Sequence, residues 1–448
     1  METGTVPLES ELTLFEYDTC SKADQASALY GHRQCLEPYV KKCYLTPAFM
    51  NNSPYLRASH FVGLFPFSAA DHTHLLLIAP KGCRQNERLG LLRFLELLAV
   101  AEGATLPEDI DDGWNGQLGA HRFLLFLASY YARLLQELCR RDFRSYYRPE
   151  AEELRSRIRG RLHLSEYASL RLQGKPHVLP CRWEEFTVDN WDNRILWAAA
   201  RRLKDIARAI DSESPAIVWK PFEGLSSWFS AVSEVPIRTD DFRKSRLGRT
   251  SRYYRQALAW ARLLLQGSDL PKAGGQVPPL IFDTHKAFEK FAEAVALAAV
   301  PEGWQKPSFQ QEAVVLTGQQ IQTHCPDILL LDSRRMMGGV GDAKYKEVLE
   351  GTPNHELETG KSVLTRIQSA DWNQLYVYMR TKEASRGFFV VPFWNADGPH
   401  IEWLDQFNFT IPACNTNDRI AVLALNLLRP LKDVKKKAAE QLRKWLLE

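Results

Sequence analysis

Residues 325–346, CPDILLLDSRRMMGGVGDAKYK, decide the fold of the C-terminal part of this chain. The apolar run at 328–331 directly follows Pro326-Asp327 and has the length of a short buried strand. Polar residues and glycines separate this run from Asp342-Ala343-Lys344. We therefore expect two neighbouring strands joined by a tight turn that brings Asp342 beside Asp327. Glycines suit such a turn, and the stretch supplies them at Gly338, Gly339 and Gly341.

The residue types in this pair of strands are those of a metal-dependent nuclease. Side chains alternate between the two faces of a strand, so Asp342 and Lys344 are expected on one side. The carboxylates of Asp327 and Asp342 are hard oxygen ligands of the kind that Mg²⁺ prefers. A lysine beside them can orient a water molecule or offset charge that builds up on a phosphate. A hairpin with solvated charges is the alternative, because acidic-x-lysine triplets are common.

Two predicted helices flank the strands and supply further candidate residues. Residues 282–300 have apolar residues at helical spacing, with Asp283 or Thr284 placed to cap the helix. Glu289 lies at the margin of that apolar stripe, either as a third metal ligand or as a surface glutamate. In the second helix, residues 369–380, Gln374 and Tyr378 are four positions apart and share a face. Both are expected to bond the catalytic lysine or a phosphate.

The order of helix with glutamate, strand with PD, strand with DAK and helix with QxxxY resembles the PD-(D/E)XK nuclease core. The wording FEKF, DAKYK and QLYVY resembles McrC, the nuclease subunit of McrBC modified-cytosine restriction systems. Residues 159–203 are similar to the GRI segment and the D-x-x-x-N-R-I helix start of that family, and residues 251–255 to its RYY segment. Together these stretches span roughly the C-terminal two-thirds of the chain.

The resemblance implies a partner and a substrate. McrC proteins work with McrB, a hexameric AAA+ GTPase that recognises and translocates DNA. In that family the part before the nuclease docks on the McrB hexamer and stimulates its GTPase by inserting into the ring. The resemblance therefore implies that residues before about 270 bind such a partner, and that double-stranded DNA is the substrate.

Composition shifts divide the 448 residues into three parts. Residues 1–90 alternate short apolar runs with turn residues, which predicts a β-rich module. Residues 91–270 are mostly helical, with a β-like insertion near 162–186. After a Pro/Gly linker at 268–280, residues 280–448 form the predicted nuclease domain. The expected fold class is a multidomain α+β protein whose C-terminal core has a mixed central sheet.

Positive charge is clustered, although the net charge is only +3. Basic clusters occur at 140–175, 238–255 and 429–444. We expect Arg252 and Arg255 to contact DNA phosphates, with Lys346 either on the DNA backbone or merely exposed. Each cluster taken alone fits a solvated helix face equally well. The last one also fits a closing amphipathic helix packed by Leu431, Val434, Leu442 and Leu446.

Several classes of protein and site are disfavoured. No apolar run reaches the length of a membrane span, and the N-terminal residues lack the basic-then-apolar order of a signal peptide, so the expected location is the cytoplasm. The eight cysteines show no metal-binding pair. The segment 358–363, ETGKSV, resembles a phosphate-binding loop but has His355 where the first glycine belongs. We therefore expect no nucleotide to bind this chain itself.

The sequence predicts the Mg²⁺-dependent DNA endonuclease subunit of a McrBC-like system, with Mn²⁺ as a substitute metal. Asp327, Asp342 and Glu289 are the predicted ligands, Lys344 the residue that positions or activates water, and Gln374 and Tyr378 its support. Two alternatives remain. One is a stand-alone repair nuclease, and the other is a non-enzymatic activator of an AAA+ motor with an inert nuclease fold.

Overall fold

The computed structural model is an α+β protein, as the sequence predicts, and folds into two compact units. One unit comprises residues 1–120 and 281–448, and the other comprises residues 121–270 with 276–280; a short piece, 271–275, belongs to the first. The three-part division at 90 and 270–280 stays a prediction. Residues 358–363 and most of the predicted linker lie outside the described residues. Those described are 11–17, 29–50, 53–69, 72–104, 118–208, 214–246, 251–266, 279–310, 313–317, 320–334, 336–346, 367–410 and 417–448.

The N-terminal part of the first unit contains a four-stranded sheet in the order β1-β5-β4-β9. Three of its strands come from the first eighty residues, but β9 (Leu280–Asp283) comes from the start of the predicted nuclease domain. β9 leads directly into helix α9 (Thr284–Ala299), which Asp283 caps by accepting a hydrogen bond from the Lys286 backbone N–H. The other elements here are β1 (Glu11–Phe15), α2 (Glu37–Lys41), β2 (Leu45–Met50), β3 (Ser53–Ala58), β4 (Phe61–Ala69), β5 (His72–Ala79), η1 (Lys81–Arg84) and α3 (Glu87–Ala101).

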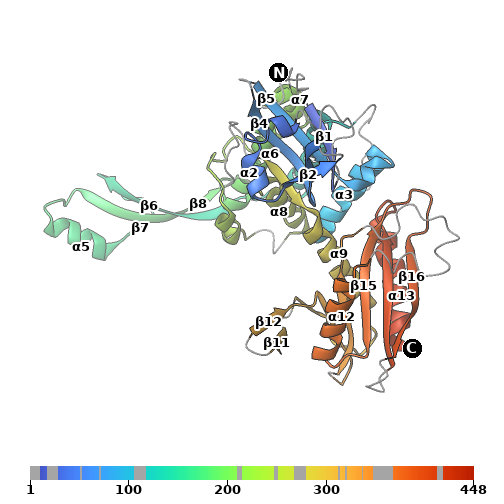
Figure 1. Ribbon diagram of the computed structural model, residues 1–448. Coiled ribbons are helices and arrows are strands. Elements are labelled where there is room, and N and C mark those ends of the chain that lie inside the picture. The colour runs from blue at the N-terminus through green and yellow to red at the C-terminus, as the bar shows by residue number, and fades with distance from the viewer. Residues whose placement is uncertain are drawn as a thin grey trace. The chain divides into compact units, whose positions relative to one another are not determined.

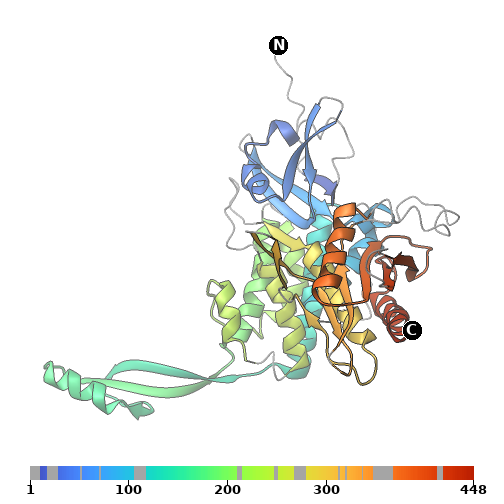
Figure 2. The same cartoon turned by 60° about the horizontal axis from the view of Figure 1, so that its bottom comes forward.

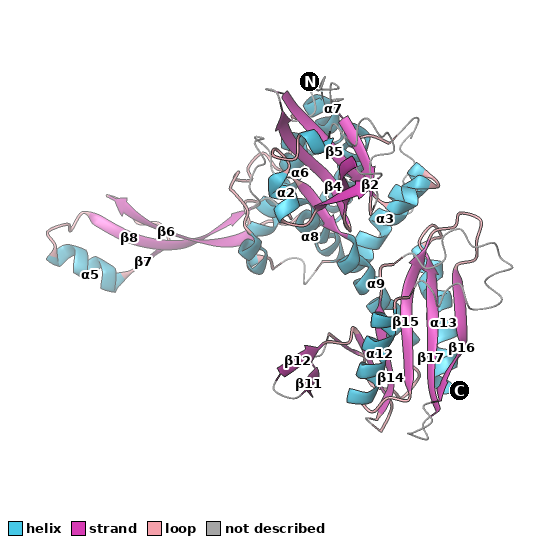
Figure 3. Ribbon diagram, viewed as in Figure 1, coloured by secondary structure: helices cyan, strands magenta, loops and turns pink. Residues whose placement is uncertain are grey.

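The C-terminal part of the same unit contains a six-stranded mixed sheet in the order β10-β13-β14-β15-β17-β16 (Figure 3). Helix α12 (Ser369–Thr381) packs on one face, and α13 (Leu431–Leu447) packs on the other. The predicted packing residues of α13 are all buried, which confirms its role as a closing amphipathic helix. The strands are β10 (Ser308–Phe309), β13 (Ile328–Leu331), β14 (Met337–Ala343), β15 (Arg386–Phe393), β16 (Ile401–Thr410) and β17 (Asn417–Asn426), beside a separate hairpin of β11 (Ala313–Thr317) and β12 (Gln320–His324).

The predicted hairpin of β13 and β14 is present, but its glycines do not form the turn. Gly338, Gly339 and Gly341 lie within β14, so that part of the prediction is wrong. A Cβ on Gly338 would lie 2.3 Å from the ring of Trp304, and one on Gly341 would lie 2.4 Å from the ring of Phe388. These two glycines leave room for aromatic rings against the strand. The glycines are therefore needed for packing with distant residues, although in the sequence they look like turn residues.

The second unit is built on helices, and a long ribbon extends away from them (Figures 1 and 2). β6 (Tyr146–Arg155) pairs antiparallel with β8 (Val178–Thr187) over ten residues each, a length of about 33 Å. Helix α5 (Leu164–Leu172) lies between these strands in the sequence, at the end of the ribbon, so the β-like stretch 162–186 contains a helix that we did not predict. The remaining elements are α4 (Ala120–Asp142), β7 (Arg161–Leu162), α6 (Trp191–Ala207), α7 (Ser214–Trp219), η2 (Lys220–Leu225), η3 (Thr239–Lys244) and α8 (Arg252–Leu265).

The two motifs singled out in this unit hold its helices together. Asp189 forms a bidentate ion pair with Arg194, at 2.6 and 2.7 Å, where β8 passes into α6. Asn193 accepts a 2.9 Å hydrogen bond from the hydroxyl of Tyr254 on α8. The D-x-x-x-N-R and RYY segments therefore meet in a buried polar network. The network gives the polar residues of both segments hydrogen-bond partners inside the unit.

No helix in the part of the chain that the structure describes is long and apolar enough to cross a membrane.

Candidate functional site

The two aspartates of the PD and DAK segments lie side by side at the end of the β13–β14 pair. Ile328 pairs with Gly341, and this antiparallel register places Asp327 opposite Asp342. Asp327 Oδ2 also accepts a 2.8 Å hydrogen bond from the backbone N–H of Ala343. The bond fixes one carboxylate to the strand that carries the other.

Lys344 is held beside these carboxylates by residues from two elements. Its Nζ lies 2.8 Å from Asp342 Oδ2, as an ion pair rather than an aligned hydrogen bond. The same ammonium donates a 2.9 Å hydrogen bond to Gln374 Oε1 on α12. Gln374 Nε2 in turn donates a 2.6 Å hydrogen bond to the hydroxyl of Tyr378. Residues more than thirty positions apart along the chain thus form one connected network.

Glu289 approaches the same place from helix α9. It is partly buried, and burial together with the charge of Asp327 raises its pKa to about 7. Gln310, which the sequence analysis missed, lies between the two residues. Its backbone N–H donates a 3.2 Å hydrogen bond to the carbonyl of Asp327, and its Nε2 lies 3.5 Å from Glu289 Oε2. Gln310 adopts a positive φ of 49°, an uncommon backbone conformation that the sequence does not announce.

Burial makes ionisation of the site's carboxylates unfavourable. Only 2% of Asp342 is exposed, and burial raises its pKa to about 7 even though Lys344 acts in the opposite direction. Burial also raises the pKa of Asp327. Burial alone would lower the pKa of Lys344, but the charge of Asp342 offsets this, so the lysine's pKa is raised and the ammonium stays charged.

The three carboxylates are ligands of the type that a hard divalent cation prefers, although their oxygen atoms do not converge on a single point. No group of three or more His, Cys, Asp or Glu side chains is arranged to hold a metal ion among the described residues. The two aspartates are nevertheless adjacent, and Glu289 is close enough for the charge of Asp327 to raise its pKa. Desolvated carboxylates that repel one another gain from a cation between them, and oxygen ligands of this kind suit Mg²⁺.

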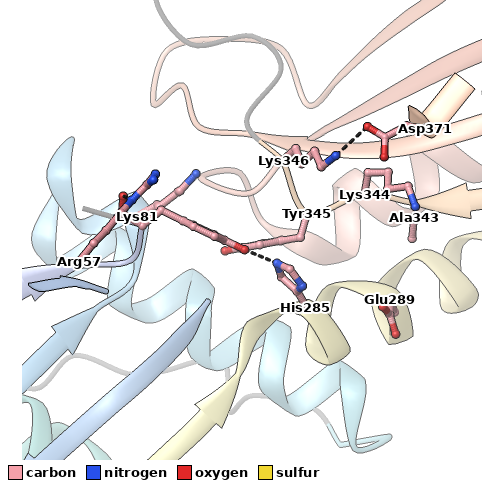
Figure 4. A pocket seen from close by; sticks show the side chains of 10 residues that line it. Arg57, Lys81, His285, Glu289, Ala343, Lys344, Tyr345, Lys346 and Asp371 are labelled. Carbon is pink, nitrogen blue, oxygen red and sulfur yellow. Dashed lines mark hydrogen bonds and ion pairs between the residues drawn. The ribbon is translucent and has the colours of Figure 1, made fainter. Parts of the chain in front are cut away.

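Two residues of the site, Glu289 and Lys344, line a pocket of about 540 Å³. Figure 4 shows Lys344, Lys346 and Asp371 on one side of it, with Arg57 and Lys81 opposite. Lys346 Nζ forms a 2.6 Å ion pair with Asp371 at the start of α12. Arg57 and Lys81 belong to the N-terminal part of the unit, and the sequence analysis did not connect them with the site. Nothing in the local sequence around these two residues distinguishes them from ordinary surface cations.

The raised pKa of Asp342 leads to a stability prediction for Asp342→Asn. From about pH 4 to pH 7 the folded protein holds this proton while the unfolded chain has lost it, so the free energy of unfolding falls as pH rises. In the absence of metal, we expect the asparagine variant to melt at a higher temperature than wild type at pH 8, and this difference to be clearly smaller at pH 5. Thermal unfolding in EDTA measures this, with exposed Asp397→Asn as control. An equal difference in melting temperature at both pH values would contradict the assignment.

The two arginines predicted to contact DNA lie in the second unit. Arg252 and Arg255 are exposed at the start of α8, and Arg252 donates a 2.7 Å hydrogen bond to the hydroxyl of Tyr253. The structure does not bring them together with the carboxylate site within one unit, so their role in DNA binding stays a prediction.

Residues 56–392 match the family described as "McrBC 5-methylcytosine restriction system component". The chain belongs to this family. The prediction of a McrBC-type family is thereby confirmed. The McrBC family match includes Arg57, the hairpin with Asp327 and Asp342, and α12, and it ends within β15. No curated protein matches the sequence.

Solved structures similar to this McrBC-family chain come from Thermococcus gammatolerans. A chain of the refined half-complex from the tetradecameric assembly of McrB AAA+ hexamers with bound McrC matches with a TM-score of 0.58 and 20% identity. The match covers 97% of this chain and 99% of that one, so the two share a fold along their whole length. A chain of the cryo-EM structure of the McrBC complex has a TM-score of 0.40 and 19% identity, over 63% of this chain and 85% of that one.

Proposed function

We propose that this protein is the Mg²⁺-dependent DNA endonuclease subunit of a McrBC-like, GTP-dependent restriction system. The observation that carries the proposal is the meeting of Asp327, Asp342, Lys344 and Gln374 at one end of a strand pair. Paired carboxylates beside a lysine are the residue types that metal-dependent phosphodiester hydrolysis uses, which supports the proposal. A mixed sheet with helices on both faces supports the further assignment of this part to the PD-(D/E)XK nucleases.

Asp327 and Asp342 are the proposed metal ligands, with Glu289 as the third carboxylate. A bound Mg²⁺ would polarise a phosphoryl oxygen and lower the pKa of a water molecule. The protein's contribution is to hold the carboxylates in place and to set a cation beside them. The bond from the Ala343 backbone N–H to Asp327 fixes one of them, and the ammonium of Lys344 favours ionisation of the other.

Lys344 is the proposed group that orients water and offsets phosphate charge. Its ammonium is fixed by Asp342 and Gln374, so little reorientation is needed when charge develops nearby. Tyr378 acts through Gln374 by holding the amide in place, and we regard it as a positioning residue.

A hexameric McrB-type AAA+ GTPase is the proposed partner. Family membership supports it, and a chain with the same fold is found together with McrB hexamers. The ribbon of the second unit is the proposed contact, because its end exposes large apolar side chains that a soluble monomer rarely leaves in water. On α5, Leu164 is 71% exposed and Leu172 is 91% exposed. The same region carries exposed arginines at 157, 159, 161 and 171.

Double-stranded DNA is the proposed substrate, and we place its cleavage in the cytoplasm, where a restriction system meets foreign DNA. Lys346 is the proposed contact to the DNA backbone nearest the site, and Arg252 and Arg255 are proposed contacts on the second unit. No nucleotide is proposed to bind this chain itself.

The test is reconstitution with a purified McrB-type partner. We expect cleavage of DNA containing 5-methylcytosine when Mg²⁺, GTP and partner are all present, and loss of cleavage when any one is omitted. Product formation on a linear duplex measures this, with unmodified DNA as control. Cleavage without the partner would instead identify a stand-alone nuclease. Stimulated GTP hydrolysis without cleavage would identify an inert activator.

A further inference from the structure

The pocket beside the carboxylates is lined by cations from two distant parts of the sequence. Lys344 and Lys346 lie directly after β14, whereas Arg57 comes from β3 and Lys81 from η1 (Figure 4). Among the described residues that line it, two are carboxylates, Glu289 and Asp371, so the described cations outnumber the acids. Burial lowers the pKa of the histidine in the lining, His285, to about 4, which leaves it neutral near pH 7.

The N-terminal cations differ from the others in how they are held. Lys344 and Lys346 are each paired with an aspartate, which cancels much of their charge. Lys81 lies over two aromatic rings, 4.8 Å from the centroid of Tyr17 and 5.3 Å from that of Trp394. Such cation–π contacts hold an ammonium in position. Glu16 is close enough for its charge to interact with Lys81, but it is 0% exposed and does not line the pocket.

Arg57 is oriented by one bond and retains further donors. Its Nε donates a 2.8 Å hydrogen bond to the carbonyl of Tyr17. It forms no ion pair with an acidic residue in the part of the chain that the structure describes. A guanidinium that keeps its terminal N–H groups available is the side chain best suited to a phosphate.

Buried hydrogen bonds fix this N-terminal face relative to the nuclease strands. The Tyr345 hydroxyl, between Lys344 and Lys346 in the chain, bonds Glu16 Oε2 at 3.1 Å. Thr284 donates its hydroxyl to the same carboxylate, and Tyr17 bonds His285. Since β9 is itself the edge strand of the N-terminal sheet, the two sheets cannot separate without breaking these bonds. Arg57 and Lys81 therefore keep a set position beside Lys344.

We propose that Arg57 and Lys81 bind DNA phosphates next to the one that is cleaved, so that the N-terminal module is part of the substrate-binding surface of the nuclease. The inference rests on the proposed function, because it takes DNA as the occupant. DNA is favoured over a single small anion because cations line both sides of a 540 Å³ pocket, and a DNA strand presents a phosphate about every 3.4 Å along its axis.

The test is DNA binding by the full-length protein in EDTA, where cleavage does not interfere. Fluorescence anisotropy with a labelled duplex of roughly 30 base pairs, at several salt concentrations, compares wild type with Arg57→Gln/Lys81→Gln. We expect weaker binding and a salt-dependence slope smaller by about two, since each phosphate contact contributes about 0.9. Arg33→Gln/Lys42→Gln, which removes two exposed charges from the same module away from the pocket, should change neither the affinity nor the slope.

A single-variant control and three contrary results complete the test. Lys81→Gln alone is measured as well, because Arg57 also bonds the backbone carbonyl of Tyr17 and its loss removes a structural contact; circular dichroism and melting temperature identify a folding defect. Equal affinity and slope for wild type and both pocket variants, including equally undetectable binding, would overturn the inference. So would unchanged DNA binding with weakened partner association, which would make this surface a protein interface. The nuclease assignment fails by a different result, namely DNA cleavage by a protein that lacks Asp342.

Discussion

Asp342→Ala is expected to abolish DNA cleavage while the protein stays folded and bound to its partner. The substitution removes the carboxylate that lies opposite Asp327 and leaves Lys344 without its nearest counter-ion. Because a metal needs ionised oxygen ligands, both metal affinity and the orientation of the lysine are lost together. We therefore expect no detectable product in the reconstituted assay at Mg²⁺ concentrations that saturate wild type.

Lys344→Ala is expected to lower the rate of DNA cleavage without abolishing it. It leaves both aspartates in place but removes the group that we propose to face the reacting phosphate, and loss of one such donor typically lowers kcat by about 10²–10³. Gln374→Ala should have a smaller effect, because the ammonium of Lys344 keeps its contact with Asp342. This order of effects distinguishes a catalytic lysine from one that only fills space.

Asp397→Ala is the matched control, since it removes an exposed carboxylate from the same unit. It should cleave DNA at the wild-type rate. Partner binding, followed by size-exclusion chromatography, should be unchanged in every one of these variants. Retained cleavage by Asp342→Ala would remove the nuclease assignment, whatever the behaviour of the partner.

Leu164→Ser/Leu172→Ser is expected to weaken association with the McrB-type partner by about 100-fold or more and to reduce stimulated GTP hydrolysis in parallel. The two leucines are among the most exposed large apolar side chains described in the chain. Burying each of them in an interface contributes about 1.5 kcal/mol or more, and about 3 kcal/mol together corresponds to roughly a 100-fold change in affinity. Their exposure also means that serine should cost little folding stability.

Leu447→Ser is the control for that experiment, because it removes a leucine that is 64% exposed on the last turn of α13. Affinity is measured by titrating the partner, and GTP hydrolysis by phosphate release. Wild-type affinity and wild-type stimulation in the α5 variant would show that the ribbon does not carry the contact. Another surface of this chain would then have to bind the GTPase partner.

Local sequence patterns predicted the individual parts of the site well. The β13–β14 pair, helix α9 with its Asp283 cap and helix α12 all follow from periodicity and end signals that depend on neighbouring residues. The same reasoning was wrong where a residue serves a distant contact. Gly341 looked like a turn residue because nothing nearby in the sequence indicates that the ring of Phe388 lies against it.

The residue types and the strand order of the carboxylate–lysine site could be predicted from the sequence, because two adjacent antiparallel strands fix which side chains are opposite each other. Three features follow from tertiary packing instead: Gln310 lies beside Glu289, β9 completes the N-terminal sheet, and Arg57 and Lys81 line the pocket next to Lys344. These contacts join segments more than two hundred residues apart in some cases. Burial of side chains such as Glu16 and Tyr345 between the two sheets creates them, and no pattern of neighbouring residues records that packing.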